Sequence, residues 1–146
     1  GTVRGTTMLE TPPSARAERK KMIPSGGEQV MCPVVRFEVM GQDADRLRRF
    51  YRDLLGWQFQ QTPALPYTSV RRDEGAPGIP GAIGQTGPGH PNWMLFYSEV
   101  PDLDAAITRA RALGSRVLMP PVRLDGRTIA VVSDPEGHPV GLCAAR

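Results

Sequence analysis

The chain has 146 residues, of which 18 are basic and 15 acidic, so its formal net charge is +3 at pH 7. Five of the basic and three of the acidic residues lie in residues 1–30, which leaves 13 and 12 in the remainder, a net charge of +1. A remainder this close to neutral has no basic block for a phosphate backbone, so nucleic acid is not a favoured partner. No stretch approaches the roughly 18 consecutive apolar residues of a membrane span, so no membrane partner is expected.

Residues 1–30 are polar, dotted with Gly, Pro and Ser, and without periodicity, which predicts a flexible N-terminal arm ahead of a single domain over residues 31–146. The arm has no apolar core followed by a small-residue cleavage site, so we expect no secretory signal. The two cysteines, Cys32 and Cys143, have no CxxC spacing and indicate neither a disulfide framework nor a zinc knuckle. A cytoplasmic protein with reduced cysteines is the expectation.

A strand and an amphipathic helix open the domain. In residues 34–40, Val35, Phe37 and Val39 alternate with other residues, which is the period of a strand with one face against a core. The next segment has apolar residues at i, i+3, i+4, i+7 and i+8, which predicts one stripe on a helix: Leu47, Phe50, Tyr51, Leu54 and Leu55. Asp43 is the expected N-cap and Gly56 the expected stop. Short strands are expected near 57–62, 67–73 and 80–85.

The second half predicts the same order of elements. A strand over MLFYSEV precedes a helix that Asp102 caps and Gly114 ends, with one apolar face formed by Leu103, Ala106, Ile107, Ala110 and Leu113. Strands are expected near 116–119, 128–133 and 138–143, and Asp125-Gly126 predicts a tight hairpin turn. Equivalent features lie 59 residues apart, as Asp43 and Asp102 or Phe37 and Phe96 do. The sequence therefore predicts two tandem βαβββ modules, over about 33–86 and 92–146.

The repeat indicates how the domain is closed. Neither module can bury its sheet alone, so we expect an α+β fold in which both modules form one curved, barrel-like mixed sheet around a cavity, with the helices outside. The helices would cover the face that carries Val35, Phe37 and Val39. The opposite face would line the cavity and would carry Arg36 and Glu38 together with their counterparts at the same offset, Leu95 and Tyr97.

These motifs, taken in order, resemble the vicinal oxygen chelate superfamily, the glyoxalase/bleomycin-resistance/dioxygenase fold. The residues that carry the resemblance are RFEV and FYRDLLGW in the first module, then VPDLDAAITRARALGSRV and VVSDPEGHPVGL in the second, so that it spans about residues 33–146. The resemblance implies a homodimer, because small members commonly pair and share groove walls.

Metal-using members of that superfamily hold the ion at four inward positions, which the resemblance carries over to Arg36, about Ala82, Leu95 and Gly141. None of these is a usual ligand of a divalent metal, and the cationic Arg36 opposes one. We therefore expect no metal and no other cofactor. The histidines, His90 and His138, lie in turn-like segments and are interpreted as polar turn residues rather than as ligands.

The candidate ligand-binding residues are those expected to face the cavity: Arg36, Glu38, Trp93, Leu95, Tyr97, Gly141 and Cys143. Arg36 is either an anchor for a carboxylate, phosphate or enolate or the structural partner of Glu38. Glu38 is either a general base with a raised pKa or an inert carboxylate paired with Arg36. Tyr97 and Trp93 would either line the pocket or pack in the core, and nothing in the sequence near Cys143 indicates a reactive thiolate.

Three functions remain open on these residues. The first is a metal-independent protein that binds a small, partly apolar molecule in the cavity, and this molecule is either neutral or anionic. The second is an enzyme, a glyoxalase-like lyase or isomerase or a dioxygenase-type protein, with Glu38 as the base. The third is a dimeric interaction or regulatory module whose cavity is filled by side chains. The sequence does not identify the ligand.

Overall fold

The computed structural model describes residues 30–61, 67–124 and 126–145. The chain divides into two units, Gly1–Met31 and Cys32–Arg146. In the first unit only Val30 and Met31 are described, and both are exposed. The flexible arm predicted for residues 1–30 therefore lies almost wholly outside the described residues.

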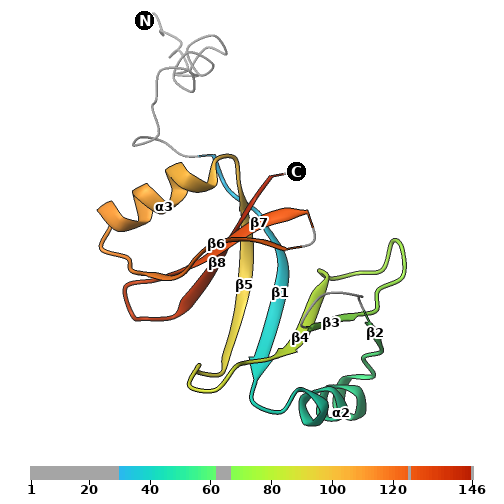
Figure 1. Cartoon of the computed structure of the whole chain (residues 1–146). Coiled ribbons are helices and arrows are strands. Elements are labelled where there is room, and N and C mark those ends of the chain that lie inside the picture. Colours follow the sequence, from blue (N-terminus) through green and yellow to red (C-terminus); the bar gives the residue numbers. More distant parts are fainter. Residues whose placement is uncertain (1–29, 62–66, 125, 146) are drawn as a thin grey trace, which may run out of the picture. The chain divides into compact units, whose positions relative to one another are not determined.

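The second unit alternates strands and helices in the order that the sequence predicts, as Figure 1 shows. The first module runs from a long strand through one helix to three short strands, and the second module repeats that order with longer strands. The elements are β1 (Val34–Gly41), α2 (Ala44–Leu55), β2 (Phe59–Gln61), β3 (Tyr67–Val70), β4 (Gly81–Gln85), β5 (Trp93–Val100), α3 (Leu103–Ala112), β6 (Val117–Leu124), β7 (Arg127–Ser133) and β8 (Pro139–Ala144).

All eight strands belong to one mixed sheet with the order β2-β3-β4-β1-β5-β8-β7-β6. The first strand of each module pairs in parallel with the last strand of the same module, β1 with β4 and β5 with β8. The modules meet at the antiparallel pair of β1 and β5 in the middle of the sheet (Figure 1). The predicted α+β fold of two βαβββ modules in one curved sheet is confirmed, and the sheet is unclosed in the described strands.

Local capping explains where the two helices begin and end. The side chain of Asp43 accepts a hydrogen bond from the backbone N–H of Arg46 at 3.0 Å, and Asp102 does the same for Ala105 at 3.0 Å. Gly56 follows α2 in the left-handed region with φ 73°, which a residue without Cβ adopts freely. Both predicted N-caps and the predicted stop at Gly56 are confirmed.

The two helices differ in how fully they pack. Leu103 and Ile107, two residues of the stripe predicted for α3, are buried against Val100 and Ala130. Leu113, the last residue of that stripe, follows the helix and is 69% exposed. In α2 the predicted stripe is present, but three of its residues stay largely exposed: Phe50, Leu54 and Leu55 are 55%, 63% and 52% exposed. The predicted helix is confirmed, and this part of its apolar stripe remains exposed.

The face of β1 on the helix side carries Phe37 and Val39. The ring of Phe37 lies 5.3 Å from that of Trp57, which stacks in turn on Tyr51 of α2 at 4.9 Å. Val35 was expected on the same face, but it packs instead against the buried cluster around Leu95 on the other side. The reason is a register shift in the pairing with β5 between Val34 and Arg36, which inserts one extra residue and interrupts the alternation.

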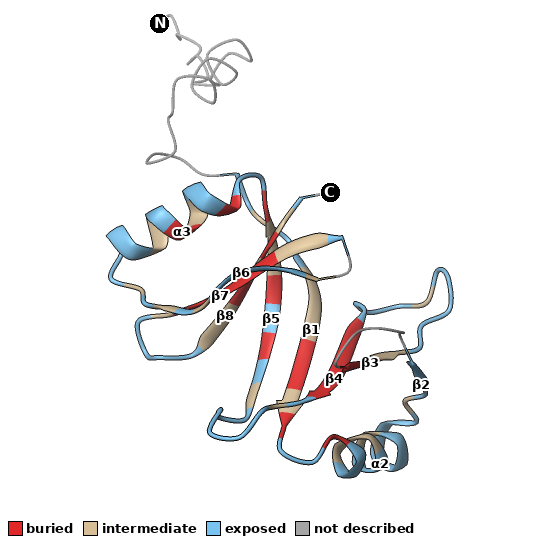
Figure 2. Ribbon diagram, in the orientation of Figure 1, coloured by how far each residue is buried: buried red, intermediate tan, exposed pale blue. Residues whose placement is uncertain are grey.

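The junction of β1 and β5 follows the internal repeat. Phe37 pairs with Phe96, the residue 59 positions later, while Arg36 pairs with Tyr97 and Glu38 with Leu95. Equivalent positions of the two modules therefore lie across a local two-fold axis that passes between the two phenylalanines. Figure 2 shows that buried residues continue along β1 and β5 from one module into the other.

Candidate functional site

The predicted site residues lie on the four central strands of the sheet. Glu38 on β1 is flanked by Ala82 on β4 and Leu95 on β5. Tyr97 on β5 is flanked by Arg36 on β1 and Gly141 on β8. This face, opposite to the helices, is called the concave face below. The register brings both candidate polar residues of the first module next to Tyr97 of the second.

Arg36 has an unusual environment for a guanidinium group. Its central carbon lies 5.5 Å from the ring centre of Tyr67 and 5.3 Å from that of Tyr97, within the range of cation–π attraction. Its Nη2 lies 3.8 Å from Oε2 of Glu38, which is an ion pair but too long for a hydrogen bond. Its Nε is buried and has no hydrogen-bond partner among the described residues. One donor of this guanidinium, Nε, therefore lacks an acceptor among the described residues.

Glu38 is buried, with 8% of its side chain exposed. Burial raises the pKa of this carboxyl above its ordinary value of 4.5, and the positive charge of Arg36 and the hydrogen bond from Tyr97 only partly oppose that rise. Both interpretations of Glu38 thus have support in the structure: Arg36 is its partner, yet the ionised form is not fully compensated.

Tyr97 connects the two modules through its hydroxyl group. The hydroxyl donates a hydrogen bond of 3.3 Å to Oε1 of Glu38. Burial, and next the negative charge of Glu38, raise the pKa of Tyr97, so the phenol stays protonated and keeps its donor. The ring is 1% exposed, so Tyr97 packs in the core and also takes part in the polar cluster.

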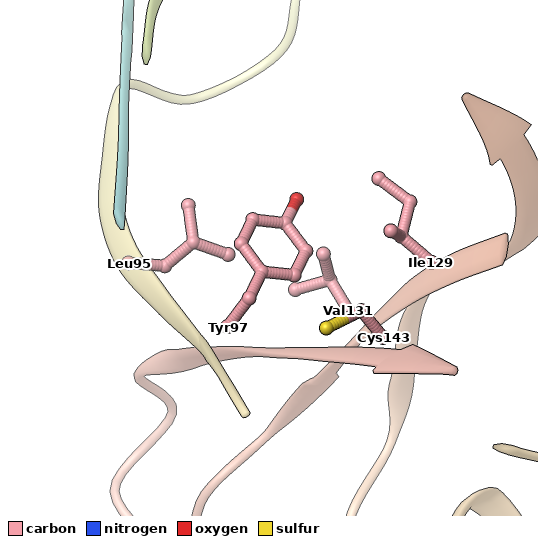
Figure 3. Close-up of a cluster of buried hydrophobic side chains, with 5 residues drawn as sticks. All are labelled: Leu95, Tyr97, Ile129, Val131 and Cys143. Carbon is pink, nitrogen blue, oxygen red and sulfur yellow. The ribbon is translucent and has the colours of Figure 1, made fainter. Parts of the chain in front are cut away.

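The second-module half of the concave face is filled by side chains. Tyr97 lies in a cluster of buried residues that extend from β5, β7 and β8 toward one another, as Figure 3 shows. Trp93, half-buried, packs against this cluster, and Cys143 is fully buried with its Sγ 3.6 Å from the carbonyl oxygen of Ser98. The cluster consists of Leu95, Tyr97, Ile129, Val131 and Cys143. Room for a ligand must therefore be sought beside Arg36 rather than beside Cys143.

Gly141 is a glycine because the ring of Tyr97 lies against it. A Cβ at this position would be 2.4 Å from Cδ1 of Tyr97 and 2.7 Å from the carbonyl oxygen of Phe96. Distances below 3 Å are closer than any ordinary carbon contact. The small residue at this position thus makes room for an aromatic side chain of the protein.

The residues at the four positions that the resemblance assigns to a metal do not fit one. They offer the guanidinium of Arg36, the aliphatic side chains of Ala82 and Leu95, and Gly141, against which the ring of Tyr97 lies. None of them carries an imidazole or a carboxylate. In the described part of the chain, no three His, Cys, Asp or Glu side chains come close enough to share an ion. These four positions therefore supply no ligand for metal-dependent chemistry.

The two histidines lie outside the concave-face cluster. His138 belongs to the turn before β8, where its Nδ1 lies 2.8 Å from Oδ2 of Asp134. Asp134 also accepts from the backbone N–H groups of Glu136 and His138, and these hydrogen bonds, that of His138 foremost, lower its pKa below its ordinary range. The backbone carbonyl of His90 accepts from Gln42. Both are turn residues, as the sequence predicts.

Tyr67, whose ring lies beside Arg36 on the concave face, is the residue of the site that sequence reasoning missed. It opens β3, pairs with Gly84 and is 6% exposed. Its counterpart at the repeat offset is not aromatic, so the internal repeat gave no signal for it. The one available signal was its place at the start of an expected strand, since the phase of that strand would have brought it onto the concave face.

Surface grooves occur elsewhere in the described part of the chain. One lies beside Trp57 and Arg71, and another lies beside Leu113 and Ser133. Neither is lined by a predicted site residue, so neither contributes to the site described here. No helix in the described residues is long and apolar enough to cross a membrane.

Comparisons with known proteins agree with this geometry. The profile of the glyoxalase-like domain matches residues 36–143. No curated protein matches the chain. Among solved structures, a glyoxalase/bleomycin resistance protein/dioxygenase superfamily member from Vibrio splendidus 12B01 is 17% identical, with a TM-score of 0.53, covering 79% of this chain and 100% of that one.

Two further structures are similar at the level of the fold. A variant of Streptomyces coelicolor methylmalonyl-CoA epimerase in complex with 2-nitronate-propionyl-CoA is 16% identical, with a TM-score of 0.51, covering 80% of this chain and 99% of its own. A hypothetical protein from Bacillus halodurans C-125 is 11% identical, with a TM-score of 0.53, covering 78% and 94%. Identities this low show the fold alone. With the match over residues 36–143, the chain belongs to the glyoxalase-like domain family.

Proposed function

We propose that the protein binds a small, partly apolar anion on the concave face, with the guanidinium of Arg36 as the anchor and without a metal. The observation that carries this proposal is the buried Nε of Arg36, which lacks a hydrogen-bond partner among the described residues. A buried donor without an acceptor costs about 1–3 kcal/mol, and a carboxylate or similar oxyanion would remove that cost.

The surroundings of Arg36 support an apolar body for the ligand. The rings of Tyr67 and Tyr97 lie next to the guanidinium, and half-buried Val35 and Trp93 belong to the same side of the sheet. The side chain of Arg36 keeps 21% of its surface exposed, whereas its Nε is buried. A ligand would therefore approach along the exposed part of the side chain and would have to displace neighbouring side chains to reach Nε. Because the donors of a guanidinium lie in its plane, a planar bidentate group such as a carboxylate suits it best.

Paired probes test this proposal. Benzoate and phenylacetate would be compared with benzamide and phenylacetamide, which keep the shape of the acids but lack their charge. The acids are expected to raise the melting temperature of the protein, the amides are not, and Arg36→Met is expected to remove the difference. Equal shifts for acids and amides, or a shift that survives in Arg36→Met, would refute Arg36 as the anchor.

A second function, an enzyme with Glu38 as the base, is favoured by one observation. Burial raises the pKa of Glu38, and a carboxyl with a raised pKa next to a cation and a phenol is suited to accept a proton from a substrate. A lyase or isomerase of this kind would lose turnover in Glu38→Gln and keep substrate affinity. Loss of affinity with unchanged turnover would count against the base.

The homodimer that the resemblance implies also remains a proposal. Its structural support is the exposed apolar end of α2, formed by Phe50, Leu54 and Leu55. Large side chains exposed side by side on one helix face are typical of surfaces that pack against another protein. A dimer would be compatible with ligand binding and with a purely interacting module alike.

A further inference from the structure

We propose that a carboxylate ligand binds to Arg36 together with a proton, which Glu38 takes up. This inference rests on the proposed function, because it concerns the same anion anchor. It adds that the site exchanges one counter-ion for another: the ligand replaces Glu38 as the anionic partner of Arg36, and Glu38 becomes a neutral carboxylic acid.

The first step is the shortage of positive charge on the concave face. Within the described part of the chain, Arg36 is the one cation that forms an ion pair with Glu38, and the two are 3.8 Å apart. Among the described residues, the other titratable groups that the strand registers place on this face are the phenols Tyr67 and Tyr97, the thiol of Cys143, and Glu99 with Arg127. Arg127 forms an ion pair with Glu99, so its charge is already matched there. The neighbours of Glu38 on β4 and β5 are Ala82 and Leu95, which are apolar. One half-buried cation would then face two anions.

The second step is the location of the free donors. The rings of Tyr67 and Tyr97 lie close to the guanidinium carbon, while Nε has no acceptor among the described residues. An incoming carboxylate would bind at this edge of the guanidinium. It would therefore come within a few ångströms of the Glu38 carboxylate, which already contacts Nη2.

The third step is the response of two close carboxylates in a dry site. Like charges held close together cannot both stay ionised at low cost, so the pKa of one of them rises strongly. Glu38 is the group that takes the proton, because it is buried, whereas the ligand keeps the hydrogen bonds of Arg36. A neutral Glu38 still accepts the hydrogen bond from Tyr97, so protonation does not break the link between β1 and β5.

Calorimetry with benzoate tests the coupling directly. Titrations of the full chain would be run at one neutral pH in two buffers that differ in ionisation enthalpy and contain neither carboxylate nor phosphate. Uptake of a proton makes the observed heat depend on the buffer, and the slope gives the number of protons. We expect close to one proton per benzoate, and an apparent Kd that rises about tenfold per pH unit at neutral pH.

Two variants assign the proton to a residue. Glu38→Gln keeps the shape and the acceptor of a protonated Glu38, so its benzoate affinity is expected to be independent of pH and its heat independent of the buffer. Glu136→Gln, a change of the same chemistry at an exposed turn residue, is expected to retain the proton uptake of the wild type.

The outcomes separate the two proposals. Benzoate binding with equal heats in both buffers overturns the proton coupling and leaves the anion anchor intact. Proton uptake that persists in Glu38→Gln overturns the assignment to Glu38. Absence of binding for benzoate and phenylacetate, in the wild type and in Glu38→Gln, overturns the anion anchor and the coupling together. The wild-type measurement in two buffers decides the matter even if a variant fails to fold.

Discussion

Tyr97 donates a hydrogen bond of 3.3 Å to Glu38, and the two residues are 59 positions apart, which is the offset of the internal repeat. The bond therefore joins the same position of the two modules across the local two-fold axis. One module supplies an acceptor there and the other a donor, so that equivalent positions carry complementary chemistry. This relationship links the stability of the junction to the charge state of the candidate site.

Tyr97→Phe removes this donor and keeps the ring. We expect the free energy of unfolding to fall by about 1 kcal/mol, because buried Glu38 loses a hydrogen bond while the contact of the ring with Arg36 remains. Urea denaturation measures the change. Tyr67→Phe is the control, since Tyr67 contributes its ring to Arg36, and it should cost less than about 0.5 kcal/mol. Equal effects of the two changes would contradict the role of the Tyr97 hydroxyl.

Gly141→Ala places a methyl group against the ring of Tyr97 and the carbonyl oxygen of Phe96. The backbone oxygen cannot move away without disturbing β5, so we expect a loss of about 2 kcal/mol in the free energy of unfolding. Gly87→Ala is the control, because the nearest atom to its Cβ would be 3.5 Å away. That variant should be as stable as the wild type or more stable by less than about 1 kcal/mol. Similar stability of both variants would contradict the tight packing at Gly141.

The pH dependence of stability should change in Glu38→Gln. The pKa of Glu38 is raised above its ordinary value of 4.5, so between these two values the folded state binds more protons than the unfolded state. The contribution of Glu38 is therefore present below pH 4.5 and is lost as the pH rises through the folded pKa. We expect the wild type to lose stability relative to Glu38→Gln over that range, measured by denaturation at each pH.

Asp134 should make the stability of both the wild type and Glu38→Gln depend on pH in the direction opposite to that of Glu38. Its pKa is lowered by hydrogen bonds, so its contribution is present above its ordinary value of 3.8 and is lost as the pH falls below it. Because the turn that contains Asp134 is unchanged in Glu38→Gln, this effect cancels in the difference. A difference that stays constant with pH, or that favours the wild type at higher pH, would refute the raised pKa of Glu38.

Leu54→Gln tests the exposed end of α2. Leu54 is 63% exposed, so we expect little change in the stability of the monomer and at least a tenfold rise in the Kd of the dimer. Sedimentation equilibrium measures both the oligomeric state of the wild type and the change in the Kd of the dimer. Leu113→Gln is the control. Leu113 directly follows α3 and is 69% exposed, and its replacement should leave the Kd of the dimer unchanged. A monomeric wild type would rule out the homodimer.

The parts of the fold that were predictable from the sequence are those decided by local chemistry or by the repeat. Asp43 and Asp102 indicate where the helices begin, because each carboxylate accepts a hydrogen bond from a backbone N–H of the first helical turn. That hydrogen bond is local and needs no tertiary partner. The offset between Phe37 and Phe96 predicted two modules, and the pairing of these two residues is the structural expression of that repeat. The inward positions of Glu38 and Tyr97 follow from the same offset.

The parts that were not predictable depend on pairing between distant strands. Val35 reaches the concave face through a register shift that only the partner strand defines, so the alternation in the sequence misplaced it. Tyr67 joins Arg36 because β3 pairs with β4 in one particular register. The exposure of Phe50 depends on which residues pack against α2, and the periodicity of the helix does not reveal them.

The pairing of Arg36 with Tyr97 and of Glu38 with Leu95 across the junction of β1 and β5 has a consequence for fragments of the chain. Each module is a continuous stretch, so a cut in the segment between β4 and β5 would separate them without dividing any strand. The first fragment would then keep a cation and a carboxylate in water, and the second would keep a phenol without its acceptor. Reassembly of the two halves would restore the site, so that binding by a mixture of fragments would report directly on their complementation.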